Sequence, residues 1–115
     1  MKAILTVILA TIASVMVAMP AYAGDITAGK QVFDNNCATC HAGGSNAVVS
    51  SQTLKQEALE SYLFNYGTDH NVEAIVYQVA NGRGAMPSFQ GRISNKAIAD
   101  VAAYVKDQSE NDWSD

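Results

Sequence analysis

The sequence predicts an all-α domain of about four short helices. Apolar residues recur with helical spacing in four segments of the 115-residue chain, and capping residues or glycines mark most of their ends. A β-sheet is not expected, because residues 47–49 (AVV) are the only β-branched cluster outside a helical period and nothing in the sequence pairs with them. The chain has no internal repeat and no linker, so a single domain is expected.

The first 23 residues are predicted to be a cleaved secretory signal peptide. Lys2 precedes an apolar run over residues 3–19, and the segment ends in the small-residue pattern AYA at residues 21–23. A membrane span is the alternative for an apolar run of this length, but the small-residue ending favours cleavage. The exported mature domain would comprise residues 24–115.

Cleavage would leave a small acidic domain of 92 residues. Six basic and eleven acidic residues remain, which give a net charge of −5. This charge excludes nucleic acid as an expected partner. A domain of this size commonly needs a disulfide, a metal or a cofactor to stabilise its core.

The first helix is expected over residues 25–36, where Ala28, Val32 and Phe33 share one face. Its last turn would present the motif CATCH at residues 37–41. The next eleven residues, AGGSNAVVSSQ at 42–52, are predicted to form a loop that begins at two glycines. A loop of this length indicates that it wraps around something.

The second and third helices are predicted from their ends. Thr53 and Gln56 have the spacing of a capping box, so a helix should begin near residue 53 and end at Gly67. The third helix is expected over residues 72–81, with Asn71 as its N-cap and Gly82 as its stop.

The C-terminal helix has the clearest pattern. Ser94 is a suitable N-cap, and Ile93 before it can pack against the helix as a hydrophobic staple. The apolar positions then follow i, i+3, i+4, i+7 spacing, which predicts one buried face made by Ile98, Val101, Ala102 and Val105.

The CATCH motif indicates the attachment of a c-type haem. A zinc site of four protein ligands would need a second pair of ligands, yet the chain has only two cysteines and two histidines. A thioredoxin-like dithiol needs a βαβ context, and a plain disulfide would not explain a histidine directly after the second cysteine. In Cys-x-x-Cys-His, Cys37 and Cys40 can bond the two vinyl groups while His41 reaches the iron.

Met86 is the expected second axial ligand of the iron. It is the one methionine that remains after the signal peptide is removed, and a thioether suits a haem that exchanges electrons. Pro87 biases Met86 away from helical angles, which favours a loop against the cofactor. Met86 as core filler and His70 as the ligand are the alternatives, but His70 is expected to be a solvated histidine in an exposed turn.

Four stretches of the mature chain resemble cytochrome c6, a family of class I cytochromes c from cyanobacterial and algal photosynthetic membranes. They are AGKQVFDNNCATCHAGGSNAV, TLKQEAL, VEAIVYQVANGRGAMPSFQGRIS and VAAYV. CATCH alone indicates only haem attachment, whereas the run from Tyr77 to Pro87 is much more specific. The resemblance implies a cytochrome c-like domain of about four short helices around one covalently bound haem c.

The resemblance also implies roles for single residues. Gly29, Phe33 and Tyr104 would form the contact where the first and last helices cross. Gln78 would lie beside the haem on the methionine side, where its amide tunes the potential. Arg92 would lie near the haem edge and help partners to dock.

By this resemblance the protein is a soluble electron carrier and not an enzyme. The donor would be cytochrome f of the cytochrome b6f complex, and the acceptor photosystem I or a terminal oxidase. The protein would lie in the thylakoid lumen or the periplasm, peripheral to the membrane and not inserted in it. The alternatives are a haem protein with an open iron site, acting as a sensor or peroxidase, and a low-potential cytochrome c6-like protein with an assembly or regulatory role.

Two residues depart from the family pattern. Ser50 and Gln52 stand where the family often has proline and lysine. Without the lysine, a possible charge partner of a haem propionate is lost. Without the proline, the backbone carbonyl that accepts the ring N–H of His41 cannot be assigned from the sequence, although that contact orients the ring.

Overall fold

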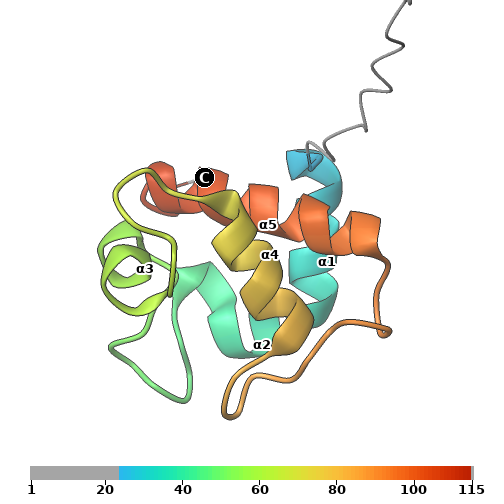
Figure 1. Ribbon diagram of the computed structural model, residues 1–115, viewed down its shortest axis with the longest axis horizontal. Helices are drawn as coiled ribbons and strands as arrows, with labels where there is room; N and C mark the ends of the chain where they lie inside the picture. Colours follow the sequence, from blue (N-terminus) through green and yellow to red (C-terminus); the bar gives the residue numbers. More distant parts are fainter. Residues whose placement is uncertain (1–23, 115) are drawn as a thin grey trace, which may run out of the picture.

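The computed structural model describes residues 24–114, and this part of the chain is helical (Figure 1). Its elements, in chain order, are α1 (Ile26–Asn36), α2 (Ala38–His41), the 3₁₀ turn η1 (Ala42–Gly44), α3 (Gln56–Tyr62), α4 (Val72–Asn81) and α5 (Asn95–Glu110). The predicted all-α class is confirmed. The predicted signal peptide lies outside the described residues. Among residues 24–114, no helix is both long enough and apolar enough to cross a membrane.

Helices α1 and α5 cross at Gly29. A Cβ atom added at Gly29 would lie 2.0 Å from the carbonyl oxygen of Asp100 and 2.8 Å from the Cβ of Tyr104. A larger residue would therefore force the two helices apart. The rings of Phe33 and Tyr104 pack beside this crossing with their centroids 5.3 Å apart. The expected contact of Gly29, Phe33 and Tyr104 is confirmed.

Trp113 completes the aromatic cluster at this crossing. Its ring lies 5.3 Å from that of Phe33 and 6.0 Å from that of Tyr104. Its indole N–H donates to the carbonyl of Leu54 at 2.9 Å, and its ring covers Gly44. The C-terminal end of the chain is thereby joined to the segment that follows CATCH.

A buried carboxylate anchors the start of α1 to α5. The backbone N–H of Asp25, the N-cap of α1, donates to Asp100 at 2.8 Å, and the Lys96 ammonium lies 2.7 Å from the same carboxylate. Asp100 is only 4% exposed. Burial alone would raise the pKa of Asp100, but the hydrogen bonds from Lys96 and Asp25 lower it below its ordinary value.

Helices α4 and α5 pack against each other (Figure 1) and begin at the predicted caps. The Asn71 side chain accepts from the N–H of Glu73, and that of Ser94 accepts from the N–H of Ala97. The range predicted for α4 is confirmed at both ends. The apolar faces of α4 and α5, together with Phe33, Leu59 and Tyr66, form the core.

The prediction for α3 was wrong at both ends. The helix begins at Gln56, after Lys55, and Thr53 instead accepts a hydrogen bond from the N–H of Lys55 at 3.3 Å. It ends at Tyr62 and not at Gly67, because the backbone turns out of the helix at residue 63, which has an extended conformation. That turn carries Tyr66 into the core, where it is fully buried.

Helix α1 ends at Asn36, as predicted, and leads directly into the CATCH motif. Cys37 is its C-cap, and residues 38–41 form α2, a separate single turn of helix. The glycine-rich loop after it was predicted correctly, apart from the short η1 at its start.

Candidate functional site

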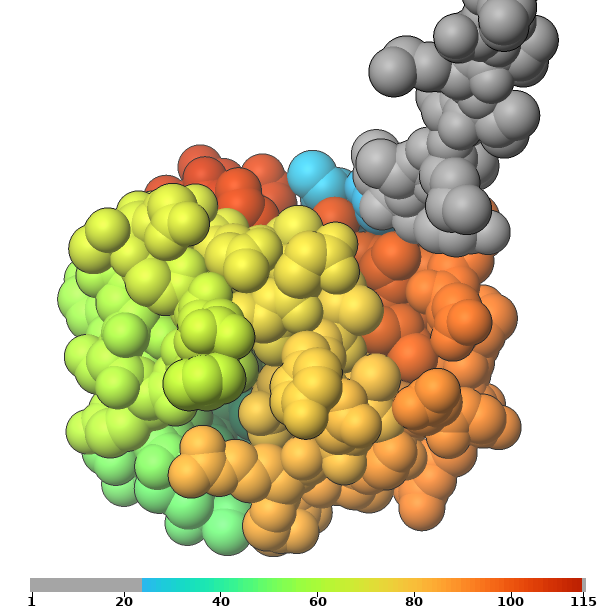
Figure 2. Space-filling model, viewed as in Figure 1, coloured from blue at the N-terminus to red at the C-terminus, as the bar shows by residue number. Residues whose placement is uncertain are grey.

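The CATCH motif lies beside a hollow on one face of the molecule. Figure 2 shows this hollow between the yellow-green segment after α3 and the gold and orange residues of α4 and the loop that follows it. Teal atoms from the region of the motif are visible at its floor. Cys37 and Met86, which lie far apart in the sequence, both pack against the core as half-buried side chains.

The two cysteines are free thiols. No disulfide joins them; Cys37 is half-buried and Cys40 is exposed. Burial, with a further contribution from the neighbouring Cys40, raises the pKa of Cys37 to about 11. Cys37 is therefore a neutral thiol at pH 7. Within residues 24–114, no three or more side chains of His, Cys, Asp or Glu come together as a metal site.

A backbone carbonyl orients the imidazole of His41. Its Nδ1 lies 2.8 Å from the carbonyl oxygen of Ser45, which can only accept, so Nδ1 carries the proton. The other nitrogen, Nε2, then has its lone pair available for a metal. Ser45 is itself fixed by hydrogen bonds from its N–H and its hydroxyl to the carbonyl of Ala42. The carbonyl that accepts the ring N–H of His41, which could not be assigned from the sequence, is therefore that of Ser45.

Asn46 closes the loop that contains the two departures from the family pattern. Its amide nitrogen donates to the carbonyl of Gln52 at 2.8 Å. Its amide oxygen accepts from the N–H groups of Val48 and Val49, each at 2.9 Å. The loop is thus held by one side chain at its start, without a proline at residue 50. Asn46 was not among the predicted site residues, although an Asx turn is a recognisable pattern at such a position.

Met86 lies in a tight turn next to Gln78. Arg83 and Met86 exchange two backbone hydrogen bonds of 3.0 Å, which close a two-residue turn. The side-chain N–H of Gln78 points at the Met86 sulfur, with 3.8 Å between Nε2 and Sδ. The structure therefore brings these two predicted site residues together and directs a donor at the thioether.

His70 is not the solvated histidine that the sequence predicted. Its Nε2 lies 2.8 Å from a carboxylate oxygen of Glu60, and its ring stacks on Tyr66 at 5.4 Å. The side chain is 20% exposed. Because Nε2 is already paired with Glu60, His70 is a poor alternative to Met86 as a metal ligand.

Arg92 lies exposed on the loop that carries Met86. Its backbone N–H donates to the carbonyl of Phe89 at 2.9 Å, and its side chain is in none of the ion pairs of the described residues. Arg83 is exposed on the same loop. These two arginines are the only charged residues in 82–93, so this loop is positively charged on an acidic chain.

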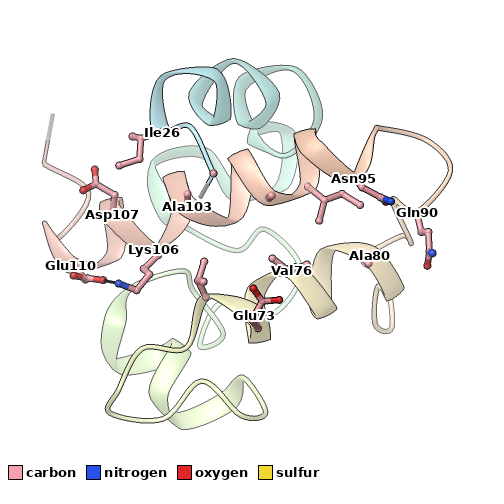
Figure 3. Close-up of a pocket in the computed structure, with 14 residues that line it drawn as sticks. Ile26, Glu73, Val76, Ala80, Gln90, Asn95, Ala103, Lys106, Asp107 and Glu110 are labelled. Atoms are coloured by element: carbon pink, nitrogen blue, oxygen red, sulfur yellow. Dashed lines mark ion pairs between the residues drawn. The ribbon is translucent and has the colours of Figure 1, made fainter. Parts of the chain in front are cut away.

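A second hollow, of about 690 Å³, lies elsewhere (Figure 3). It lies between α4, α5 and the start of α1, where Ile26, Val76 and Ala103 contribute apolar surface. The ion pair of Lys106 and Glu110 borders it. No residue of CATCH lines this hollow, and neither does Met86, so it is separate from the candidate site.

The chain is similar to known proteins over most of its length. A family model described as cytochrome C oxidase, cbb3-type, subunit III matches residues 24–105. Cytochrome c6 from Picosynechococcus sp. is 53% identical over 114 residues, which are 96% of this chain and 97% of the relative.

Solved structures show the same similarity. Cytochrome c6 from the diatom Phaeodactylum tricornutum has a TM-score of 0.74 and 48% identity, covering 78% of this chain and 100% of the diatom chain. Oxidised cytochrome c6A from Arabidopsis thaliana has a TM-score of 0.70 and 27% identity, covering 79% of this chain and 96% of the plant chain.

Proposed function

Since the chain belongs to the cytochrome c6 family, we propose that it carries single electrons between two photosynthetic membrane complexes, with His41 and Met86 as the axial ligands of its haem iron. Members of this family are electron-transfer proteins with a covalently bound haem c, and not enzymes. The residues that hold the haem are proposed below, and so are the redox partners. Bound haem c supplies an iron that alternates between the ferric and ferrous states.

Cys37 and Cys40 are the proposed attachment points. Both are free thiols at the two ends of one helical turn, a spacing that suits the two vinyl groups of one haem. In the attachment reaction each sulfur forms a bond to a vinyl carbon and the thiol hydrogen goes to the other carbon. The neutral state of Cys37 at pH 7 leaves its sulfur protonated until attachment.

His41 and Met86 are proposed to fill the axial positions. The Ser45 carbonyl keeps the proton on Nδ1 of His41, which leaves Nε2 as the ligand. The observation that carries the proposal is the contact between the Gln78 amide and the Met86 sulfur. A donor directed at a thioether holds its orientation and withdraws electron density from it, which is the tuning role expected of Gln78.

The proposed partners are cytochrome f of the cytochrome b6f complex as donor and photosystem I, or a terminal oxidase, as acceptor. The soluble protein would act in the thylakoid lumen or the periplasm, peripheral to the membrane. Exposed Arg83 and Arg92 give the loop beside Met86 a net positive charge, whereas the rest of the chain is net negative. Such a local charge favours brief docking in one orientation.

Two substitutions at Met86 test the axial ligands. In the holoprotein, Met86→His should keep two axial ligands and lower the midpoint potential, because imidazole favours ferric iron more than a thioether does. Met86→Ala should let added imidazole bind the ferric iron. An absorption band from a methionine–iron bond should be present only with Met86. If neither variant changes the spectrum or the binding of imidazole, Met86 is not a ligand.

A further inference from the structure

The loop that carries Met86 is tied to the last turn of α4. The N–H of Phe89 donates to the carbonyl of Val79 at 3.0 Å, and the N–H of Gln90 donates to that of Ala80 at 3.2 Å. The last four carbonyls of a helix have no partner within the helix. The loop supplies partners for two of them, so the end of α4 serves as its support.

Gly82 allows the loop to fold back over this support. Its φ of 67° and ψ of 176° lie in a region that is essentially restricted to glycine. A Cβ atom added at Gly82 would lie 2.5 Å from the carbonyl oxygen of Met86 and 2.6 Å from the carbonyl carbon of Pro87. The backbone of Met86 therefore rests directly on the end of α4.

Ser88 adds a side-chain bond to the same support. Its hydroxyl donates to the carbonyl of Ala80, which thus accepts from both Ser88 and Gln90. The turn closed by Arg83 precedes Met86 in the sequence, and Ser88 follows Met86 by two residues. An opening that lifts residues 86–88 together off the end of α4 must break the bond of Ser88.

We propose that Ser88 is a positioning residue for Met86: its hydroxyl holds the loop closed on α4 and so slows the departure of the thioether from the iron. The proposal rests on the proposed function, in which Met86 is an axial ligand. Ser88 is exposed, so water replaces part of the bond when it is lost. The expected effect is therefore about two- to fivefold in the population of the open loop, the low end for one hydrogen bond.

The test compares Ser88→Ala with Ser88→Thr in the ferric holoprotein. Ser88→Ala should raise, by about two- to fivefold, both the rate of imidazole binding to the iron and the hydrogen exchange rates of the Phe89 and Gln90 amides. Ser88→Thr keeps the hydroxyl and should remain close to wild type. Ser114→Ala is the matched control, because the Ser114 hydroxyl also donates to a backbone carbonyl at an exposed position. The midpoint potential should not change in any of them.

Two readouts separate failure of this proposal from failure of the ligand assignment. Unchanged exchange rates in Ser88→Ala would overturn the role of Ser88 in closing the loop. Faster exchange with unchanged imidazole binding would overturn its action on Met86, provided that Met86→Ala does speed imidazole binding. If Met86→Ala has no effect either, the ligand assignment has failed, and the role proposed for Ser88 fails with it.

Discussion

Replacing Gln78 by leucine tests whether its amide acts on the Met86 thioether. Gln78→Leu removes the N–H that lies 3.8 Å from the sulfur but keeps a side chain of similar size with good helix propensity. A hydrogen bond to the sulfur weakens its donation to iron, which favours the ferrous state. The midpoint potential should therefore fall when the bond is removed.

The size of this fall follows from the geometry. A hydrogen bond contributes about 0.5–1.5 kcal/mol net, and a 3.8 Å contact from a half-buried side chain belongs to the lower part of that range. About 0.5–1 kcal/mol of preference for the ferrous state corresponds to about 20–40 mV, because 59 mV is about 1.4 kcal/mol for a one-electron couple. This shift is large enough to measure.

A redox titration of the holoprotein, followed by absorption, measures the shift. Gln90→Leu is the control, since Gln90 is an exposed glutamine on the loop that carries Met86. It should leave the potential unchanged. The proposed action of the Gln78 amide would be refuted if the midpoint potential of Gln78→Leu equalled or exceeded that of the control. The loss of a polar side chain near the haem would then outweigh the loss of the hydrogen bond to the Met86 sulfur.

Three further predictions concern folding and docking. The double substitution Cys37→Ala, Cys40→Ala should give no covalent haem and a largely unfolded mature chain by circular dichroism, whereas a protease-resistant apo domain would contradict this. Asp100→Ala should cost about 1–3 kcal/mol of unfolding free energy at pH 7, because the N–H of Asp25 loses its buried acceptor. The pKa of Asp100 is lowered in the folded state, so the stability that its charge contributes is fully present above the ordinary carboxyl value of 3.8 and is lost as the pH falls through the folded pKa. Denaturant titrations of the wild type and the variant should therefore differ most at pH 7, and the difference should shrink as the pH falls below 3.8. Arg92→Glu should slow electron transfer to photosystem I in flash kinetics with an unchanged spectrum and potential, and added salt should reduce the difference from wild type.

The helices that the sequence predicted well are those with local start and stop residues. Asn71 and Ser94 bind N–H groups two or three residues further on, so the sequence alone contains both partners. The prediction of where the second helix ends failed, because that end depends on a contact with a residue far away in the sequence. Tyr66 has helical spacing, but it reaches the core by leaving the helix, and its hydroxyl lies 3.4 Å from that of Ser109. Nothing near Tyr66 in the sequence indicates this.

The same distinction applies to the aromatic core. Phe33 and Tyr104 were expected to meet because the family resemblance covers both helices. Trp113 was not expected there, because a residue near the C-terminus has no helical pattern that assigns it a neighbour. Its contacts with Leu54 and Phe33 span 59 and 80 positions of the chain. Such contacts arise only when the fold brings the segments together.

The two proposed axial ligands differ in how much of their surroundings the sequence reveals. His41 is oriented by the carbonyl of Ser45, four residues away, and any chain that forms α2 and η1 supplies that acceptor. Met86 is positioned by Gln78 and by the free carbonyls at the end of α4, which are available only because the helix stops at Gly82. Met86 can therefore be identified by elimination, but the strength of its hold depends on where a helix ends. A change that lengthens α4 by one turn would remove those carbonyls and should loosen Met86 while leaving His41 in place.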